Sequence, residues 1–571
     1  MFEFVEKRMF VVLIIVACII PSGSMGQQSL PPEIIAYADM VLYNGKVLTV
    51  DENFTIVQAV AVRDGKILTV GSSDRILQMA GPNTTRIDLE GKTLIPGFID
   101  VHAGRFFLGG HGPGGPSYLP NHSRVRFEDL DDGLRKIKGA VEKADAGEWV
   151  FVRAQRTVAA YQLTGQMLDA VAPNNPLLVN LDNTTGFVNR KGMSYLPDDV
   201  KTGIYKDRNG EPTGRIAGWA YGVLTYEILP WPEQEALEKM IQNQKEIFKK
   251  VNAMGITSIG TSGSGLLITI QRELYMRGEL PLRIRLTSEM ARQNPNTERY
   301  LKRVGNFMDV GDEWFKIAGM VVSSIDGTIG SAGFLTREPK RNMEPWDAMG
   351  LYGQNKWREM AEEGKDWREY SDYKNAVLAG KYGWNVTEIH SQGDQAMSLL
   401  LEVFDEINKV RPIKGKRFGI VHGSMRPSDL AKKFAAYDAM ISHNASYLFY
   451  GDDVVALEKM YGPDRVAGMQ PVRDLIDMGF KPILEVADTE LTESREALDE
   501  AQGIYLESME AFITRKNNTI GKIVGPNQRI TRQEALKMAT AWAARFYGDE
   551  DIMGTIEPGK LADLVILGAQ Y

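Results

Sequence analysis

The chain has 571 residues, of which 43% are hydrophobic and 25% are charged, a composition typical of a globular protein with a large core. Its formal net charge is −8, and acidic and basic residues are mixed along the chain. Because nucleic-acid binding needs a concentrated basic surface, this balance argues against a nucleic-acid partner.

The N-terminal residues predict an export signal. Two basic residues precede an apolar run from Met9 to Ile20, and small residues follow, which is typical of a secretory signal peptide over residues 1–26. We therefore expect a periplasmic or secreted protein. The run is shorter than the about 20 residues of a membrane helix, so we expect no stable membrane span after cleavage. Lipidation at Cys18, the single cysteine, and retention as a membrane anchor are the alternatives.

Residues 38–95 predict a small β-sheet. The dipeptides Asn44-Gly45 and Asp64-Gly65 each lie between two apolar-rich strands. Such dipeptides are typical of two-residue hairpins, because both turn positions need a positive φ. A further apolar strand ends the chain within residues 551–571, which predicts either pairing with the N-terminal sheet or a missing tail.

Helix and strand patterns alternate from residue 96 to residue 550. Residues 233–255 carry apolar side chains at intervals of three and four, and the short strand pattern "ITSIG" follows them. Similar units recur, and their strands end in polar residues. They favour an α/β fold with a parallel (β/α)8 TIM-like barrel, whose active site lies at the carboxyl ends of the strands. A doubly wound sheet is the alternative, but no G-x-G-x-x-G motif follows a strand to support it.

Several residues that can bind metal lie at the ends of predicted buried strands: His102, His390, His422, His443 and Asp488. One such residue alone is more often a hydrogen-bonded residue at a strand end. On successive strands of a barrel, however, these side chains would point into the same mouth. Neutral imidazoles beside a carboxylate suit zinc or a similar divalent ion, which activates water near neutral pH.

Four motifs occur in order along the chain: "GKTLIPGFIDVHA", "HSQGDQAM", "IVHGSMRPSDLAKKFA" and "GTIEPGKLADLVIL". Together they resemble the amidohydrolase superfamily, in particular its YtcJ-like branch (amidohydrolase family 3), which includes N-substituted formamide deformylase. The resemblance implies a metal-dependent hydrolase barrel with insertions over residues 96–550. It also implies a small β-sandwich built from residues 38–95 and 551–571.

The resemblance further implies roles for individual residues. Three histidines and one aspartate would bind metal, and the aspartate would also act as the general base: His102, His390, His422 and Asp488. Lys316 resembles a lysine that relatives carboxylate to bridge two metal ions, and an ordinary lysine with a buried stem is the alternative. Contacts with a small-molecule substrate are expected from His443, Asp326 and Tyr447. Tyr447 is chosen because it follows closely after His443, and ordinary packing within the barrel is the alternative.

The chain departs from the family pattern at three places. Gly104 stands where relatives carry the second histidine of a His-x-His pair, so we expect one ion, or two ions in an asymmetric site. His111, on a glycine-rich segment, is a candidate replacement ligand, and a solvated loop histidine is the alternative. Thr184 stands where relatives carry a histidine that faces the substrate, and Thr489-Glu490 follow Asp488 where a small residue and proline are usual.

The residues and the resemblance together predict hydrolysis of an amide or a related C–N bond by water that the metal activates. A secreted binding protein that keeps the barrel without turnover is the alternative, motivated by Gly104 and Thr184. A lyase or isomerase on the same site is a third hypothesis, because a metal that polarises a carbonyl also acidifies the neighbouring C–H. The sequence does not identify the substrate, and a homodimer is expected only because it is common in the family.

Overall fold

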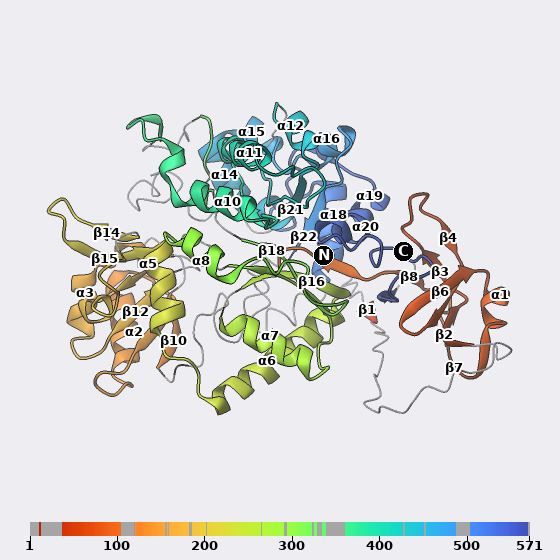
Figure 1. Cartoon of the computed structure of the whole chain (residues 1–571), viewed down its shortest axis with the longest axis horizontal. Helices are drawn as coiled ribbons and strands as arrows, with labels where there is room; N and C mark the ends of the chain where they lie inside the picture. Colours follow the sequence, from red (N-terminus) through yellow and green to blue (C-terminus); the bar gives the residue numbers. More distant parts are fainter. Residues whose placement is uncertain are drawn as a thin grey trace, which may run out of the picture.

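A computed structural model describes residues 11–12, 37–103, 119, 121–154, 157, 159–181, 185–200, 203–263, 265–289, 294–321, 325–327, 334–338, 360–425, 429–449, 453–486 and 503–568. Figure 1 shows three parts in a row. The small N-terminal sheets lie at one end, an inserted sheet lies at the other, and the parallel strands with their helices lie between them.

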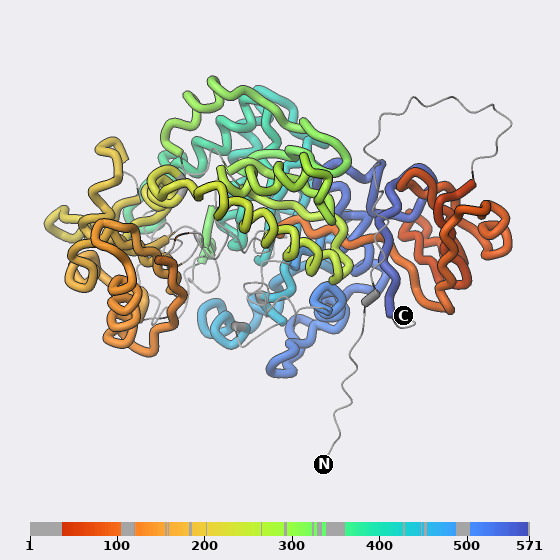
Figure 2. The backbone as a smooth tube through the Cα atoms, turned by 90° about the horizontal axis from the view of Figure 1, so that it is seen from below, coloured from red at the N-terminus to blue at the C-terminus, as the bar shows by residue number. Residues whose placement is uncertain are grey.

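Two small sheets share one apolar core at the N-terminal end of the molecule. The four-stranded sheet contains β2 (Ala38–Tyr43), β5 (Ala59–Arg63), β6 (Lys66–Gly71) and β7 (Ala80–Asp88), with α1 (Ser73–Leu77) beside it. The five-stranded sheet contains β1 (Val11–Val12), β3 (Lys46–Leu48), β4 (Ile56–Val57), β8 (Thr93–Pro96) and β23 (Leu564–Leu567). Strand β23 pairs antiparallel with β8, so the C-terminal end joins the N-terminal sheet (Figure 2). The expected pairing of the terminal strand with the N-terminal sheet is observed.

One of the two predicted hairpins is present. Asp64 and Gly65 have positive φ and join β5 to β6, with Arg63 opposite Lys66. The hairpin predicted at Asn44-Gly45 is wrong, because β2 pairs with β5 and β7 whereas β3 pairs with β4 and β8. Asn44 does have a φ of 57°, so the chain turns there. A turn dipeptide encodes local backbone geometry but not the neighbour of the following strand, and here the chain crosses between the sheets.

Parallel strands in chain order form the centre of the molecule. One sheet contains β9 (Phe98–Asp100), β16 (Ile256–Gly263), β17 (Arg283–Ser288) and β18 (Phe315–Met320). The other contains β19 (Ile389–His390), β20 (Gly419–Val421), β21 (Met440–Asn444) and β22 (Ile483–Glu485). A parallel bridge between Met320 and Val386 joins the sheets, and the Val486 N–H donates to Asp100 Oδ2 at 3.2 Å, which brings the last strand to the first. The predicted α/β class is confirmed.

Helices lie between successive parallel strands and after the last of them, β22, and most of them pack apolar side chains into the largest core cluster of the described residues. Their bounds are α6 (Gln234–Ala253), α7 (Leu266–Met276), α8 (Thr297–Val304), η5 (Trp367–Glu369), α10 (Ser371–Lys381), α11 (Asp394–Asn408), α12 (Ala431–Ala436), α13 (Ser446–Phe449), α14 (Asp453–Tyr461), α15 (Pro463–Ala467), α16 (Val472–Asp477), α18 (Ile504–Thr514), η7 (Pro526–Gln528), α19 (Arg532–Ala539) and α20 (Ala541–Phe546). The helix predicted over residues 233–255 is confirmed by α6. In the part of the chain that the structure describes, no helix is both long enough and apolar enough to cross a membrane.

A six-stranded sheet is inserted between β9 and β16. Its strands are β10 (His122–Val125), β11 (Val150–Ala154), β12 (Leu177–Asn180), β13 (Thr185–Val188), β14 (Ile204–Lys206) and β15 (Pro212–Ala217). Its helices are α2 (Leu130–Val141), η1 (Ala160–Gln162), α3 (Gly165–Val171), α4 (Arg190–Met193), α5 (Gly218–Val223) and η2 (Leu224–Ile228). Two apolar clusters, one on each side of this sheet, give the insertion a core of its own.

Candidate functional site

Three histidines meet at the carboxyl ends of parallel strands. His102 lies two residues after β9, His390 ends β19, and His422 follows β20. The ring centroids of His102 and His422 are 4.9 Å apart, and those of His390 and His422 are 4.7 Å apart, both in edge-to-face contact. The side chain of His422 is 1% exposed, whereas those of His390 and His102 are 15% and 20% exposed. The cluster is therefore buried at His422 and open to solvent at the other two rings.

Two of these imidazoles are held by buried carboxylates. His390 Nδ1 lies 3.2 Å from Asp326 Oδ1, and His422 Nδ1 contacts Glu485 Oε1. We assign the ring proton to Nδ1 in both, because a carboxylate is an acceptor. Nε2 is then the ring atom that carries the free lone pair for a ligand, an arrangement typical of metal-binding histidines.

His102 faces a third buried carboxylate in a different way. Its Nδ1 lies 3.5 Å from Glu388 Oε2, which is longer than a charge-assisted hydrogen bond. The Glu388 side chain is fully buried, and its Oε1 lies 3.0 Å from the Tyr547 hydroxyl. Sequence reasoning did not select Glu388 or Glu485. The sequence feature that could have identified them is a charged residue inside an apolar strand pattern, because such residues are rarely buried without a partner.

Backbone strain accompanies the same residues. His422 has a φ of 76° and Glu388 a φ of 53°, in the left-handed region that non-glycine residues rarely occupy. Such a conformation costs about 1–2 kcal/mol per residue. Strain of this kind persists where the surrounding structure imposes it and is concentrated at functional sites.

Electrostatics keep Glu485 ionised and His443 neutral. Burial raises the pKa of Glu485, but the adjacent His422 and the hydrogen bond from Ser442 outweigh it, so the pKa is lower than usual. Burial lowers the pKa of His443 to about 4, against a weaker opposing effect of Gln470. His443 is therefore uncharged at neutral pH.

A chain of buried hydrogen bonds links His443 to His390. His443 Nδ1 donates to Gln470 Oε1 at 3.0 Å, and Gln470 Nε2 donates to Ser424 Oγ at 3.1 Å. Ser424 Oγ donates to Gln392 Oε1 at 2.7 Å, and Gln392 Nε2 donates to His390 Nε2 at 3.2 Å. Every donor along this chain has an acceptor, so the directions are mutually consistent with the Nδ1–H tautomer of both histidines. A cation bound at His390 Nε2 would displace the Gln392 amide.

Asp326 contacts the Nδ1 atom of His390. Besides His390, it accepts hydrogen bonds from the backbone N–H groups of Gln392 at 3.0 Å, Gly393 at 2.8 Å and Leu335 at 3.1 Å. These contacts anchor the carboxylate in a buried position, where it orients His390. Its expected contact with substrate stays a prediction, as does that of the fully buried His443.

The structure does not bring Lys316 to the histidines. Lys316 lies near the start of β18, and its Nζ donates to the Tyr547 carbonyl at 3.1 Å and to Asp549, which also pairs with Arg285. Burial lowers the pKa of Lys316, and Asp549 acts in the opposite direction. These contacts match the alternative of an ordinary lysine with a buried stem. The role as a carboxylated bridge stays a prediction.

Several residues singled out from the sequence lie outside the described residues: Gly104, His111, Thr184, Asp488 and the side chain of Tyr447. Among the described residues, no group of three or more His, Cys, Asp or Glu side chains is arranged to hold a metal ion. The donor chemistry nevertheless fits a divalent cation such as zinc, because neutral imidazoles held by carboxylates converge at one place.

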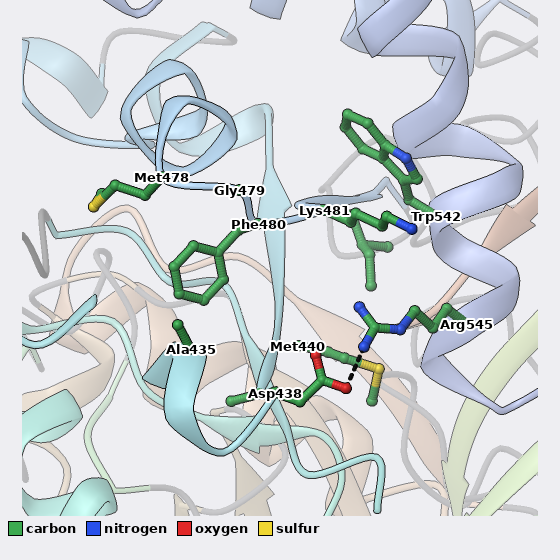
Figure 3. Close-up of a pocket in the computed structure, with 11 residues that line it drawn as sticks. Ala435, Asp438, Met440, Met478, Gly479, Phe480, Lys481, Trp542 and Arg545 are labelled. Atoms are coloured by element: carbon green, nitrogen blue, oxygen red, sulfur yellow. Dashed lines mark hydrogen bonds and ion pairs between the residues drawn. The ribbon is translucent and has the colours of Figure 1, made fainter. Parts of the chain in front are cut away.

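A cavity of about 110 Å³ lies apart from the three histidines, near the starts of β21 and β22 (Figure 3). Met440 and Ile483, at the starts of β21 and β22, line it together with Phe480. The ion pair between Asp438 and Arg545 borders it. The histidines lie at the carboxyl ends of the strands, so this cavity is not part of the candidate site.

Comparison with known proteins gives matches over most of the chain. The Amidohydrolase family matches residues 85–571. Protein LONG AFTER FAR-RED 3 of Arabidopsis thaliana is 24% identical over 556 residues, which cover 95% of this chain and 89% of that protein. N-substituted formamide deformylase of Arthrobacter pascens is 24% identical over 563 residues, which cover 93% of each chain. Putative amidohydrolase YtcJ of Bacillus subtilis is 22% identical over 545 residues, which cover 92% of this chain and 94% of that protein.

A solved structure shares the fold. The crystal structure of an uncharacterized metal-dependent hydrolase from Pyrococcus furiosus matches with a TM-score of 0.62 and 18% identity, covering 93% of this chain and 99% of that chain. At this identity the match establishes a common fold. The resemblance expected from the sequence motifs is confirmed by these matches.

Proposed function

Because this chain belongs to the amidohydrolase family, we propose that it is a metal-dependent hydrolase that cleaves an amide or a related C–N bond of a small molecule. The observation that carries the proposal is the convergence of His102, His390 and His422 at the carboxyl ends of parallel strands. The order of those strands and the contact of Val486 with Asp100 support a closed (β/α)8 barrel, in which these ends form the mouth.

The three histidines would hold the cation, with Asp488 as a further ligand from beyond the end of β22. When bound, zinc or a similar ion would lower the pKa of water and polarise a carbonyl. Asp326 and Glu485 hold the proton on Nδ1 of His390 and His422, so that Nε2 of each ring is the donor atom. Asp488 would accept a proton from the attacking water at its carboxylate and return it to the leaving nitrogen.

The relative from Arthrobacter pascens is named for the deformylation of N-substituted formamides, which supports an amide substrate for this chain. The solved relative from Pyrococcus furiosus is named as metal-dependent, which supports a cation. Because Gly104 removes one expected nitrogen ligand, we propose one ion, or two ions in an asymmetric site, in each chain.

Metal content tests this function. Elemental analysis of the purified protein should find about one zinc or similar ion per chain, and the double variant His390→Ala, His422→Ala should lose it, because both donors come from these rings. Wild-type protein that carries no divalent ion even after incubation with Zn²⁺, together with a single His390→Ala variant that behaves like wild type, would contradict the proposal.

A binding protein without turnover is the second candidate function. It is favoured by Gly104 and by the hydrogen bond from Gln392 that occupies His390 Nε2. Metal-dependent hydrolysis of any amide from a screen of small amides would exclude it.

A further inference from the structure

We propose that Glu388 supplies a ligand oxygen to the cation beside His102, in place of the nitrogen that is lost at Gly104. This inference rests on the proposed function, since it concerns how the chain holds the ion. Sequence reasoning did not assign Glu388 to the site.

Glu388 presents a buried carboxylate oxygen whose hydrogen-bonding capacity is not used. Among the described residues, Oε2 of Glu388 accepts no hydrogen bond, although the side chain is fully buried. The other oxygen, Oε1, shares the single proton of the Tyr547 hydroxyl with the Val101 carbonyl, which lies 2.6 Å from that hydroxyl. Burial of a carboxylate oxygen that accepts no hydrogen bond is unfavourable. A cation would remove this cost.

The separation of Glu388 Oε2 and His102 Nδ1 suits two ligands of one ion. Donor atoms each about 2.0–2.1 Å from zinc and separated by a tetrahedral angle lie roughly 3.4 Å apart. The two atoms are 3.5 Å apart, whereas a charge-assisted hydrogen bond would bring them to about 2.7–2.9 Å. The observed distance is therefore close to that of a shared ion.

The surrounding structure fixes Glu388 in this position. Its φ of 53° shows that the backbone is held in an unfavourable conformation two residues before His390. Burial raises the pKa of Tyr547 well above its usual value, so its hydroxyl stays protonated and acts as a donor. Gly260 leaves room for Tyr547, because a Cβ there would lie 1.5 Å from the hydroxyl oxygen. A carboxylate oxygen is a suitable ligand for zinc and for harder divalent ions.

Metal affinity of the full-length protein tests the proposal. Metal-free wild type, Glu388→Gln and His390→Ala would each be titrated with Zn²⁺ in competition with a chromophoric chelator. Glu289→Gln is the matched control, because Glu289 lies just after the end of β17 and accepts a hydrogen bond from Ser262. Thermal unfolding without metal would show that each variant is folded.

We expect Glu388→Gln to bind Zn²⁺ at least tenfold more weakly than wild type and Glu289→Gln to match wild type. Wild-type affinity in Glu388→Gln with weakened binding in His390→Ala would overturn the role of Glu388 and leave the proposed function intact. Absence of Zn²⁺ binding by the wild type would overturn both.

Should Glu388→Gln not fold, a crystal structure of zinc-soaked wild type decides the question. Oε2 of Glu388 within about 2.2 Å of the ion supports the proposal. An ion bound by His102 with this oxygen more than 3 Å away overturns it.

Discussion

His443 shows how burial determines the charge state of a single residue. Its ring is fully buried on β21, and its Nδ1 donates to Gln470. Removal from water disfavours the charged imidazolium, and the amide oxygen of Gln470 compensates only in part. The neutral ring can therefore act as a polar group at the site without adding positive charge beside His422.

The folded protein should lose stability in mild acid through His443. Because its pKa is about 4 in the folded state and about 6.5 in the unfolded chain, the unfolded state takes up the proton first as the pH falls. The contribution of neutral His443 to the unfolding free energy is complete above about pH 6.5 and is lost as the pH falls toward 4. Between pH 7.5 and pH 5, wild type should lose about 2 kcal/mol more of its unfolding free energy than His443→Gln.

Urea unfolding at the two pH values measures this difference. An equal change in unfolding free energy between the two pH values for wild type and His443→Gln would show that His443 is not the titrating group.

Individual helices are stabilised by contacts between residues that lie close together in the sequence, and α19 is an example. The Thr531 side chain accepts the N–H of Glu534 at 3.2 Å, and the Glu534 carboxylate accepts the N–H of Thr531 at 2.7 Å, which is a capping box. Glu534 also accepts a hydrogen bond from Arg473 of α16 at 2.8 Å. A local cap thereby also orients α19 against a neighbouring helix.

Thr531→Ala should lower the unfolding free energy by about 1 kcal/mol, because the backbone donor at the start of α19 loses its acceptor. Thr531→Ser keeps the hydroxyl and should remain close to wild type. Chemical denaturation of both variants measures the effect, and equal stability of the alanine and serine variants would contradict the capping role.

At the scale of the whole molecule, the C-terminal segment connects the parallel strands to the small sheets. Asp549 pairs with Arg285 of β17 and Lys316 of β18. Arg283 of β17 makes two hydrogen bonds, of 2.8 and 2.9 Å, with Asp563, which directly precedes β23. These buried contacts span more than 200 residues of sequence, so they form only when the central strands and the terminal segment are both in place.

Variants at this ion-pair cluster separate a structural role of Lys316 from a metal-binding one. Asp549→Asn should lower the unfolding free energy by roughly 3–5 kcal/mol, because it leaves two buried cations without their carboxylate. Lys316→Met should keep the wild-type metal content, since Asp549 retains Arg285 and the histidines are unchanged. Urea unfolding and elemental analysis measure the two effects.

Lys239→Met is the control variant. It removes an exposed ion pair with Glu235 and should leave the unfolding free energy close to that of wild type. Loss of metal in Lys316→Met, with the fold intact, would instead restore the carboxylated bridge as the better interpretation.

The sequence by itself determined the α/β class, the family, helix α6 and the positions of His102, His390 and His422 at strand ends. These features follow from periodicity and from motifs, which are local properties of the chain. Only the tertiary structure decided that Asn44-Gly45 crosses between sheets, that Lys316 lies with Asp549, and that Glu388 and Glu485 face histidines. Each of these depends on which distant strand becomes a neighbour, and long-range packing rather than local propensity sets that choice.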